Sequence, residues 1–579
     1  MPGSQTLALT EIKLEIGGQP APAEMLGQVL EVVVDQQVRL PSMFTLRLED
    51  KALKWVDASQ LEIGKEISIA VTAAGSGTHD PVSGPLFKGE ITALEPDYAR
   101  DGSVMLVVRG YDKLHRLHRG RQTRSFLEMT DADAVKKAAG EAGLAVKTDV
   151  TSPTHKYILQ NNQTNLEFVQ ERAARHGYQV FVAEGTLNFV KGAVNQGAGP
   201  TLKLGENLVH FQPRLTAARQ ADKVEVRGWD PAGKREFVAQ ATPSAAPQQA
   251  GLSQAGGAVA KKAFGAAKVI LVNRPVATVD DAQALAQAEA EAISASFLQA
   301  EGSCLGDPRL QAGRTVTLEG LGARFSGQYH VTAATHVIKT GGDYLTHFAV
   351  SGTEAPTISQ LVAPAGPPAG EFGVVIAVVT NLSDPDKLGR VKVKFPWLGD
   401  NVESAWARVA SPSAGSGYGL AYLPEVNDEV LVAFEHGDIH RPYILGSLWN
   451  GTDKPPEADK LVDGGKVVQR VIKSRSGHLI ILDDTDGAEK IIIRDKTGEN
   501  EIEIASADKT LKIKIGGDVT LEAQGAIALK SPSKDITLDC ANFKVKASQN
   551  VTVEASSNLD LKATSNCTVQ GTAGVTVKN

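Results

Sequence analysis

The chain is long enough for several folded domains and carries little net charge. It has 579 residues, 42% of them hydrophobic and 22% charged, with a formal net charge of -7 at pH 7, as in ordinary globular proteins. This charge excludes the basic class of general nucleic-acid binders, and three scattered cysteines, Cys304, Cys540 and Cys567, exclude a disulfide framework and fit assembly in a reducing cytoplasm.

The first third predicts strands and two helices. Strand-length segments that alternate or run apolar lie at 31–40, 43–50, 66–74 and 104–112. One helix is expected after Thr130, through residues 131–144. A second begins at Thr164, because Glu167 stands at the spacing of a capping box, and Gly177 is placed to end it.

The middle of the chain mixes a loop, a helix, strands and a linker. Residues 241–262 are small and poorly hydrophobic, which predicts a long flexible surface loop. An alanine-rich helix is expected from Asp280 to Gln299, followed by strands at 314–321, 328–338 and 344–350. A Pro/Gly/Ala stretch predicts a domain boundary at 355–371.

A compact run of short strands follows the linker. The segments 374–380, 389–397, 405–411 and 428–435 are separated by turn residues. Several short strands within roughly 80 residues favour a small barrel of the OB type.

The C-terminus carries an eight-residue repeat. From Asp518 each unit opens with an apolar–polar–apolar triplet and ends in small polar residues, and anchors recur at Phe543, Val551, Leu559, Cys567 and Val575. Such a period indicates a stacked β architecture. Eight residues are too few to enclose a core with one chain, whereas three chains can each supply one side of a triangle and pair their strand edges with one another.

The repeat therefore predicts an intertwined homotrimeric column; the alternative is a monomeric β-rich tail or a low-complexity stalk. The apolar positions expected to form the trimer core are Val519, Leu521, Ile536, Leu538, Val545, Val551, Val553, Leu559, Leu561, Val569, Val575 and Val577. The last rung would end with open strand edges that a partner must cover. The residues expected to bind that partner are Gly574, Val575, Thr576, Val577, Lys578 and Asn579.

Several long motifs resemble one family. Residues 383–397 and 405–451 resemble the OB-fold domain of VgrG and phage-type spike proteins. Residues 474–498 resemble the neck that follows it, and residues 109–126 and 160–182 resemble the hub region. The resemblance covers nearly the whole chain.

The resemblance implies a mainly β fold with an α+β hub. Its parts would be a baseplate-hub-like region at 1–370 with two barrel-like modules, an OB-fold domain at 371–455, a neck at 456–510 and the trimeric β-helix spike at 511–579. It further implies a structural spike of a contractile injection system that connects a hexameric inner tube and baseplate proteins to a membrane-puncturing tip capped by a PAAR-repeat protein.

The motifs leave two alternatives for the branch of the family. The hub motifs around residues 114–121 and 160–168 are closer to spikes of extracellular, phage-tail-like systems. The alternative is a type VI secretion VgrG spike that acts mainly as a carrier of tip-bound effectors. The sequence lacks a secretory signal and a membrane-spanning run, so we expect a cytoplasmic protein that leaves the cell within a particle.

No motif predicts catalysis, a metal site or a cofactor. His436 and His440 lack the Glu and the helix of a zincin motif, which favours a turn. The glycine-rich segment 415–419 is expected to be a barrel loop, and Asp483, Asp484 and Asp486 a turn of the neck, because EF-hand spacing is absent. A cell-wall hydrolase is the remaining enzymatic alternative.

The densest basic run lies at 109–124. Its arginines Arg116, Arg119, Arg121 and Arg124 either make ion pairs at subunit or tube contacts or form a solvated face. No aromatic platform is interleaved with them, which disfavours nucleic-acid binding.

Overall fold

The computed structural model describes residues 10–73, 81–192, 198–230, 234–244, 252, 254–271, 274, 276, 278–351, 373–396, 398 and 402–578. It divides into two compact units, Met1–Lys454 and Pro455–Asn579. Within the described ranges, no helix is both long enough and apolar enough to cross a membrane. Cys304 is buried, Cys540 and Cys567 are exposed, and all three are free thiols.

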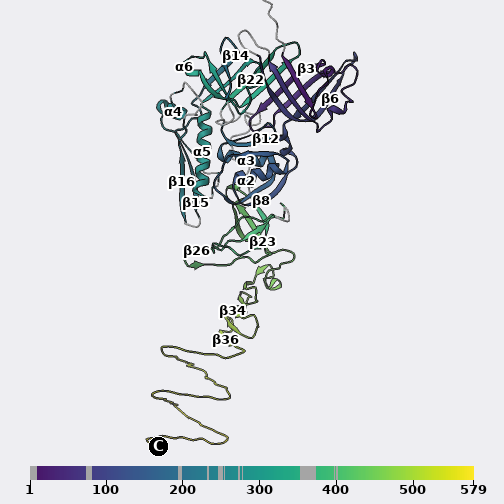
Figure 1. Cartoon of the computed structure of the whole chain (residues 1–579). Coiled ribbons are helices and arrows are strands. Elements are labelled where there is room, and N and C mark those ends of the chain that lie inside the picture. The colour runs from purple at the N-terminus through teal and green to yellow at the C-terminus, as the bar shows by residue number, and fades with distance from the viewer. Residues whose placement is uncertain are drawn as a thin grey trace, which may run out of the picture. The chain divides into compact units, whose positions relative to one another are not determined.

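An 11-stranded sheet dominates the first unit (Figure 1). In spatial order its strands are β14 (Leu208–Leu215), β18 (Leu298–Leu305), β22 (Tyr344–Ser351), β21 (Ala333–Lys339), β3 (Val29–Gln37), β4 (Met43–Glu49), β7 (Val104–Tyr111), β6 (Val82–Tyr98), β5 (Glu66–Ala73), β1 (Glu11–Ile16) and β2 (Gln19–Pro20). The short helix α1 (Ala23–Leu26) and the 3-10 helix η1 (Ser59–Leu61) lie in its N-terminal half.

The sheet carries two separate hydrophobic cores, one for each half. Phe44, Ile67 and Leu106 belong to the core of the N-terminal half, and Val316 and Phe348 to that of the other half. The second half adds a three-stranded sheet of β13 (Ala198–Lys203), β19 (Thr315–Glu319) and β20 (Gly327–His330), and the helix α6 (Gly322–Phe325). Antiparallel pairing of β21 with β3 joins the halves into one continuous sheet.

A helical layer packs on smaller sheets in the same unit. Helix α2 (Asp131–Glu141) and helix α3 (Asn165–His176) pack with a three-stranded sheet of β9 (Ala145–Thr148), β11 (Tyr178–Ala183) and β12 (Thr186–Lys191). Strands β8 (Gln122–Met129) and β10 (His155–Gln163) form a ribbon beside them, and the 3-10 helix η2 (Lys113–His118) contributes Leu114 and Leu117 to the core. Both helix starts are as predicted: Thr130 and Thr164 accept from the backbone N–H groups of Asp133 and Glu167.

The predicted helix and the predicted loop in the middle of the chain both need correction. Helix α5 (Val279–Ala295) packs against β15 (Lys223–Asp230) and β16 (Arg235–Ala241), which pair with β17 (Lys268–Leu271) (Figure 1). It ends before the predicted Gln299, which lies in β18. The end of the predicted loop 241–262 lies instead in helix α4 (Gly256–Phe264), whose Gly256 and Gly257 fit closely against Phe297 and Ala221, where larger side chains would clash. Residues 245–251 and 253 of that loop lie outside the described residues. The predicted linker 355–371 lies outside the described residues.

A five-stranded barrel-like sheet closes the first unit. Its order is β24 (Lys392–Lys394), β23 (Val374–Asn381), β28 (Glu429–Phe434), β29 (Pro442–Ser447) and β25 (Arg408–Val409). Val379, Val432 and Phe395 lie in its core, and Leu159 of β10 packs into the same cluster. The small hairpin of β26 (Ala414–Gly415) and β27 (Tyr418–Gly419) contains the predicted glycine-rich loop.

The second unit begins with short strands and ends without any ladder. The hairpin β30 (Val462–Asp463) and β31 (Lys466–Val467), near the 3-10 helix η4 (Ala458–Lys460), precedes an antiparallel meander. The meander comprises β32 (Gln469–Lys473), β33 (Leu479–Asp483), β34 (Lys490–Arg494), β35 (Glu501–Ala505) and β36 (Thr510–Lys514). It extends past the predicted neck boundary at residue 510. Over the described residues 515–578 the chain pairs no strand with itself.

Candidate assembly surfaces

The backbone of the C-terminal segment follows the eight-residue period of its sequence. Bends lie at 516–517, 524–525, 532–534, 541, 548–549, 556–557, 564–565 and 572–573. The bends recur every eight residues, except that the bend at 541 is shifted by one residue. Extended backbone separates the bends, so each octad supplies one straight edge and one corner.

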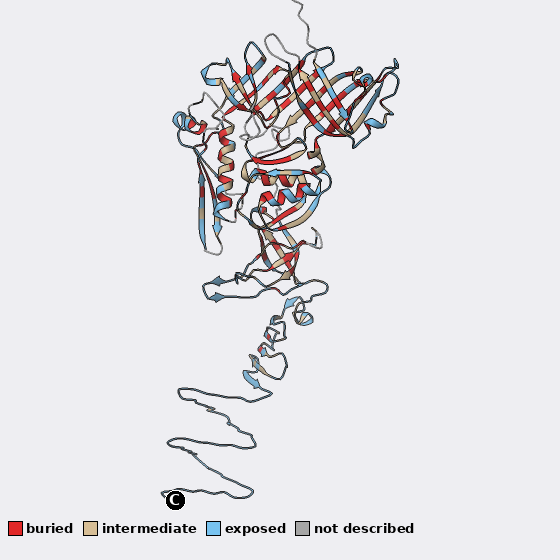
Figure 2. Cartoon of the chain, viewed as in Figure 1, coloured by how far each residue is buried: buried red, intermediate tan, exposed pale blue. Residues whose placement is uncertain are grey.

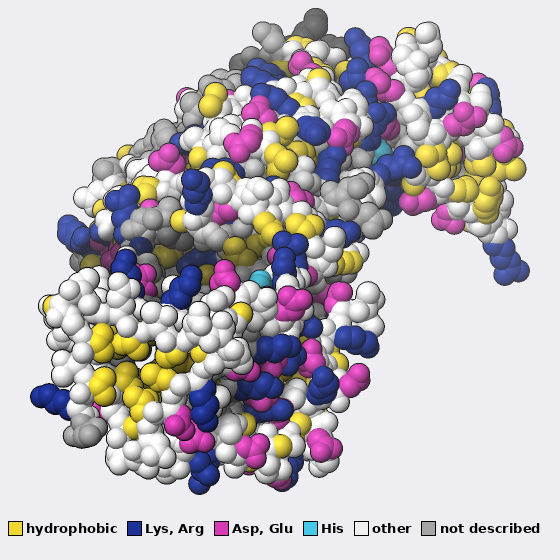
Figure 3. Space-filling view, turned by 90° about the horizontal axis from the view of Figure 1, so that it is seen from below, with side chains coloured by type: hydrophobic (Ala, Val, Ile, Leu, Met, Phe, Trp, Pro, Cys, Tyr) yellow, Lys and Arg dark blue, Asp and Glu magenta, His cyan; other side chains and the backbone are white. Residues whose placement is uncertain are grey.

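The side chains predicted to form the trimer core are all exposed in the single chain. The exposed fractions run from 54% at Val575 to 89% at Val577. Figure 2 shows this segment in the colour of exposed residues, in contrast to the buried strands of the first unit. Figure 3 shows hydrophobic side chains gathered in a patch on the face seen from below. The predicted core residues of the octads are thus left uncovered by their own chain.

The predicted tip-binding residues lie at the open end of this segment. Gly574, Val575, Thr576, Val577 and Lys578 are exposed, and Asn579 lies outside the described residues. Gly574 has a positive φ of 122° and donates its backbone N–H to Gly571 O at 3.3 Å, which forms the last corner. The strand edges that follow this corner are unpaired in the described chain.

The basic run makes ion pairs within its own chain, an arrangement that neither prediction included. Arg116 forms a two-point pair with Glu90, with Nε donating to Oε2 at 2.9 Å. Burial raises the pKa of Glu90, but hydrogen bonds from Arg116 and His115 outweigh it and lower the pKa below its usual value. The second pair joins Arg121 to Glu167 at 3.1 Å.

The other two arginines of the run differ from each other. Arg124 donates to Gln160 at 2.9 Å and to Asn165 at 3.1 Å, and it also pairs with Glu141. Arg119 follows η2 and is exposed. Arg116, Arg121 and Arg124 therefore hold η2 and the start of β8 against neighbouring elements. Of these four arginines, Arg119 has no such side-chain contact to the part of the chain that the structure describes.

The turn prediction for the histidine pair is confirmed, and one histidine has a further contact. His436 lies in the 3-10 turn η3 (Glu435–Gly437) with φ 51°. His440 Nδ1 donates to Asp438 at 2.7 Å, and its Nε2 lies 2.9 Å from the backbone nitrogen of Leu159 in β10. Burial raises the pKa of Asp438, but the hydrogen bond from His440 outweighs it, so the pKa falls well below its usual value. The imidazole therefore joins the barrel-like sheet to the hub ribbon.

The aspartates of the neck also form a turn, as predicted. Asp483 accepts from Gln469 at 2.8 Å and from Thr485. Asp484 pairs with Arg470, and Asp486 with Lys466 at 3.5 Å. Among the described residues, no group of three or more His, Cys, Asp or Glu side chains has the geometry of a metal site.

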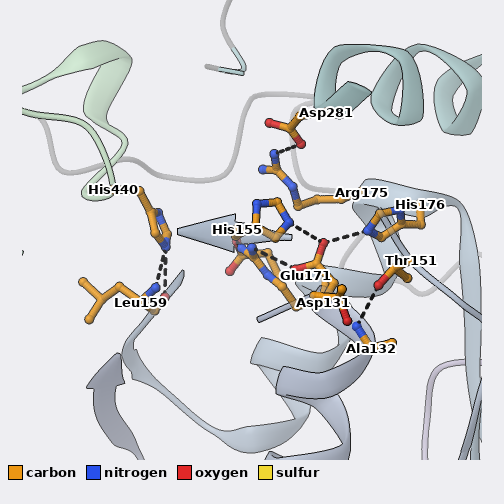
Figure 4. Close-up of polar contacts among 12 residues, drawn as sticks. Asp131, Ala132, Thr151, His155, Leu159, Glu171, Arg175, His176, Asp281 and His440 are labelled. Carbon is orange, nitrogen blue, oxygen red and sulfur yellow. Dashed lines mark hydrogen bonds and ion pairs between the residues drawn. The ribbon is translucent and has the colours of Figure 1, made fainter. Parts of the chain in front are cut away.

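A buried charge network in the hub was not predicted (Figure 4). Asp131, the first residue of α2, is 1% exposed. His176 of α3 and His155 of β10 donate to its Oδ2 at 2.7 and 3.1 Å, and Arg172 lies 3.5 Å from Oδ1. Burial raises the pKa of Asp131, but the two imidazoles and the guanidinium outweigh it and hold the pKa well below its usual value.

This network fixes the helical layer of the hub. It joins α2, β10 and α3, and Thr151 accepts from the backbone N–H of Ala132 beside it at 2.9 Å. Arg175 of α3 extends the set by donating to Asp281 of α5 at 2.5 Å. The sequence offered little signal for it, because an Asp in the first turn of a helix is equally explained by the helix dipole.

Two family models match the chain. The first is described as the Alg8 N-terminal domain and matches residues 6–340. The second is described as the type VI secretion system/phage-baseplate injector OB domain and matches residues 375–449. The second match coincides with the five-stranded barrel-like sheet.

Curated relatives match shorter stretches. The type VI secretion system spike protein VgrG4b of Pseudomonas aeruginosa is 32% identical over 148 residues, which are 25% of this chain and 16% of the relative. The actin cross-linking toxin VgrG1 of Vibrio cholerae is 41% identical over 75 residues, 12% of this chain and 7% of the relative. The chain therefore spans less than a fifth of the length of these relatives.

One solved structure has a similar fold over most of the chain. The Francisella PdpA-VgrG complex, in its lidded form, gives a TM-score of 0.52 at 10% identity, and the match covers 88% of this chain and 81% of that chain. The mainly β architecture, the match to the injector OB domain and the match over the N-terminal residues are consistent with the same kind of protein. The chain is similar to VgrG and phage-type spike proteins over its OB domain and in its overall fold, and it belongs to the family described by the Alg8 N-terminal domain.

Proposed function

We propose that three copies of this chain form the structural central spike of a contractile injection system. The hub at 1–370 and the OB-fold domain at 371–455 would join the hexameric inner tube and the baseplate. The neck and the octads would form a stiff column that carries a PAAR-repeat tip protein and pierces a target membrane by force.

The exposed apolar rows of the octads carry this proposal. Val551 and Val553 are 62% and 65% exposed, although their sequence alternation is that of strands with one buried face. Burying apolar surface is the main favourable contribution to protein association. Copies of the same segment would supply both the missing core and the missing strand partners, because each backbone edge needs hydrogen bonds.

Light scattering on the purified full-length protein tests the assembly. We expect a mass of three times the 61.2 kDa of one chain. A well-folded monomer would overturn the proposal, because it would show that the octads are stable with their apolar rows in water.

The tip partner can be tested separately. Removing the residues after 515 should abolish binding of the PAAR-repeat protein while the hub still assembles with tube protein. Full-length protein that fails to bind a PAAR-repeat protein would contradict this part of the proposal.

A second candidate is a type VI secretion spike that carries effectors at its tip. The similarity to VgrG4b favours it, since that relative is a type VI secretion system spike protein. Images of native particles would separate the two, because only an extracellular system would appear as a particle free of the cell. We further propose that the chain itself is not an enzyme, and we expect no release of peptidoglycan fragments in a hydrolase assay.

A further inference from the structure

The charges on the octads alternate in sign from one octad to the next. Each octad opens with an apolar–polar–apolar triplet, and the residue directly after the triplet is charged in six successive octads. We call these six residues the charge column: Glu522, Lys530, Asp539, Lys546, Glu554 and Lys562. The sign changes at every step, although the intervals between neighbouring charges vary from seven to nine residues. The alternation therefore follows the octads and not a fixed spacing in the sequence.

The single chain provides no partners for these charges. All six are exposed, and none of them forms an ion pair with any other residue in the part of the chain that the structure describes. A bend separates each octad from the next (Figure 1). The next charge in the sequence therefore lies beyond a corner, and an oppositely charged neighbour has to come from elsewhere.

The proposed column places the six residues on its outer surface. Side chains alternate between the two sides of an extended segment. The first and third residues of each octad are apolar and would face the core, as Val551 and Val553 do in the octad that contains Glu554. The second and fourth residues then face outward, and the fourth position carries the charge column.

Three-fold symmetry brings consecutive charges of different copies together. In the column each copy supplies one edge at every level and then turns the corner to the next edge. The next octad of one copy therefore lies over the preceding octad of its neighbour, on the same face. Neighbouring strands of a sheet lie about 4.8 Å apart, and all strands of one face run in the same direction. Glu554 of one copy would thus lie beside Lys546 and Lys562, which belong to the two other copies.

The apolar residues of the octads do not distinguish one octad from the next. A slip of one copy by one octad would replace Val551 by Leu559 at the same level, and an aliphatic core would still close. The same slip would place Lys562 of that copy between Lys546 and Lys562 of the other two. Like charges directly opposite each other on neighbouring strands are destabilising. Every step of the charge column that involves the slipped copy would change from opposite to like charges.

We propose that the charge column selects the register of the three copies through ion pairs between consecutive octads of different copies. This inference rests on the proposed trimeric spike and adds to it the partner of each charged residue. One exposed ion pair contributes little to stability. A slip by one octad, however, reverses the sign of many contacts together, and complementary charges fix the register of an interface in this way.

Two rearrangements of the same charges separate their order from their number. K530E/E554K leaves the net charge unchanged but gives three acidic octads followed by three basic octads, so only the step from Asp539 to Lys546 joins opposite charges. The matched control exchanges all six signs, E522K/K530E/D539K/K546E/E554K/K562E. This six-fold exchange also leaves the net charge unchanged, and it keeps the alternation at every step.

Cross-linking of full-length chains reads the register. The chains carry C540A/C567V, so that Cys304, which is buried, is the one native thiol left. With T568C/T576C, copies in register bring position 568 of one copy to about 5 Å from position 576 of the next. A short bis-maleimide reagent should then join all three copies on a denaturing gel. With T568C alone, copies in register hold their thiols on different faces, whereas a copy slipped by one octad brings two thiols side by side and gives linked pairs.

We expect three linked copies from T568C/T576C in the otherwise unchanged chain and in the six-fold exchange. K530E/E554K should lower that yield several-fold and should produce linked pairs with T568C alone. Aggregation of K530E/E554K beside a normal six-fold exchange would also support the proposal, because the two variants differ in the order of their charges.

Light scattering on the same samples distinguishes the failure of this inference from the failure of the proposed spike. Trimers in which K530E/E554K leaves the links unchanged would overturn the role of the charge column alone. A six-fold exchange that loses the links would overturn it as well, because alternation is then not sufficient. A chain that is monomeric before any charge is changed would overturn both proposals.

Discussion

In the unit Met1–Lys454 the apolar strand residues are covered by side chains of the same chain, whereas in the unit Pro455–Asn579 most of them face solvent. Val379 of β23 and Val551 of the octads illustrate the difference. Both occupy alternating apolar positions, yet Val379 is fully buried and Val551 is 62% exposed. Alternating apolar residues indicate that one face of a strand is to be buried. Whether the same chain or another molecule buries that face depends on which strands the segment can pair with.

The reason lies in which strands each segment can reach. Strand β23 pairs with β28, more than forty residues later, and the two form a closed core with Phe395. An octad has a corner every eight residues and never returns to its own earlier strands. The first unit therefore has its cores within one chain, whereas the octads of the second unit have none in one chain, and we propose that other copies supply it.

The largest effect is expected from a charge inside the column. Val551→Asp would bring three carboxylates to the axis, where an unpaired buried charge costs several kcal/mol per ion. We expect the C-terminal segment to lose its resistance to limited proteolysis, while the thermal unfolding of the hub stays unchanged.

Thr552→Asp is the matched control, because residue 552 lies on the opposite side of the same extended stretch. It should leave proteolytic resistance at the level of the unmodified protein. Equal resistance to proteolysis in the two variants would show that Val551 does not face a shared core. The contrast drawn between the two units would then not hold.

Local signals in the sequence predicted part of this structure well. The starts of α2 and α3 followed from Thr130 and Thr164, because a cap involves residues only three apart. Helix α4 was missed, since its glycines disfavour a helix and are required by close contacts with Phe297 and Ala221 from distant segments. The pairing of β21 with β3 joins residues about 300 positions apart and left no local signal.

The candidate surfaces divide in the same way. The octad rows could be predicted because a repeat is visible in the sequence itself. The intrachain partners of the basic run, Glu90 and Glu141, gave no local signal, because they lie 26 and 17 residues from the arginines that they contact. The Asp131 network was missed for the same reason. The apolar ladders across β32 to β36 could be found only from the register of five strands, although the alternation of isoleucines was present in the sequence.

A smaller effect, confined to the first unit, is expected from the buried carboxylate. Asp131→Asn removes the charge that faces Arg172, which is 4% exposed. Removing one partner of a buried pair costs about 3–5 kcal/mol. We expect the hub to unfold at a lower temperature and denaturant concentration at pH 7, with the trimer unaffected. Asp133→Asn, at a half-exposed position of the same helix turn, should have little effect.

The same variant predicts a pH dependence. The pKa of Asp131 is held well below its usual value in the folded hub, while the unfolded chain has a pKa of about 3.9. Its contribution to stability is therefore complete above the unfolded pKa and is lost as the pH falls toward the folded pKa. The difference in stability between wild type and Asp131→Asn should narrow as the pH falls below about 4. A difference that widens in acid would contradict this account.

The smallest effect is expected from the cap of α3. Thr164 accepts from the backbone N–H of Glu167 at 3.1 Å, and the Glu167 side chain accepts from the backbone N–H of Thr164 at 2.9 Å. Thr164→Ala should lower the free energy of unfolding of the hub by about 1 kcal/mol, whereas Glu167→Gln keeps the capping box and should cost less. Because the cap lies wholly within one chain, neither change should alter the oligomeric state. A loss of trimer in Thr164→Ala would show that the hub contributes to association, and the two units would then not be independent.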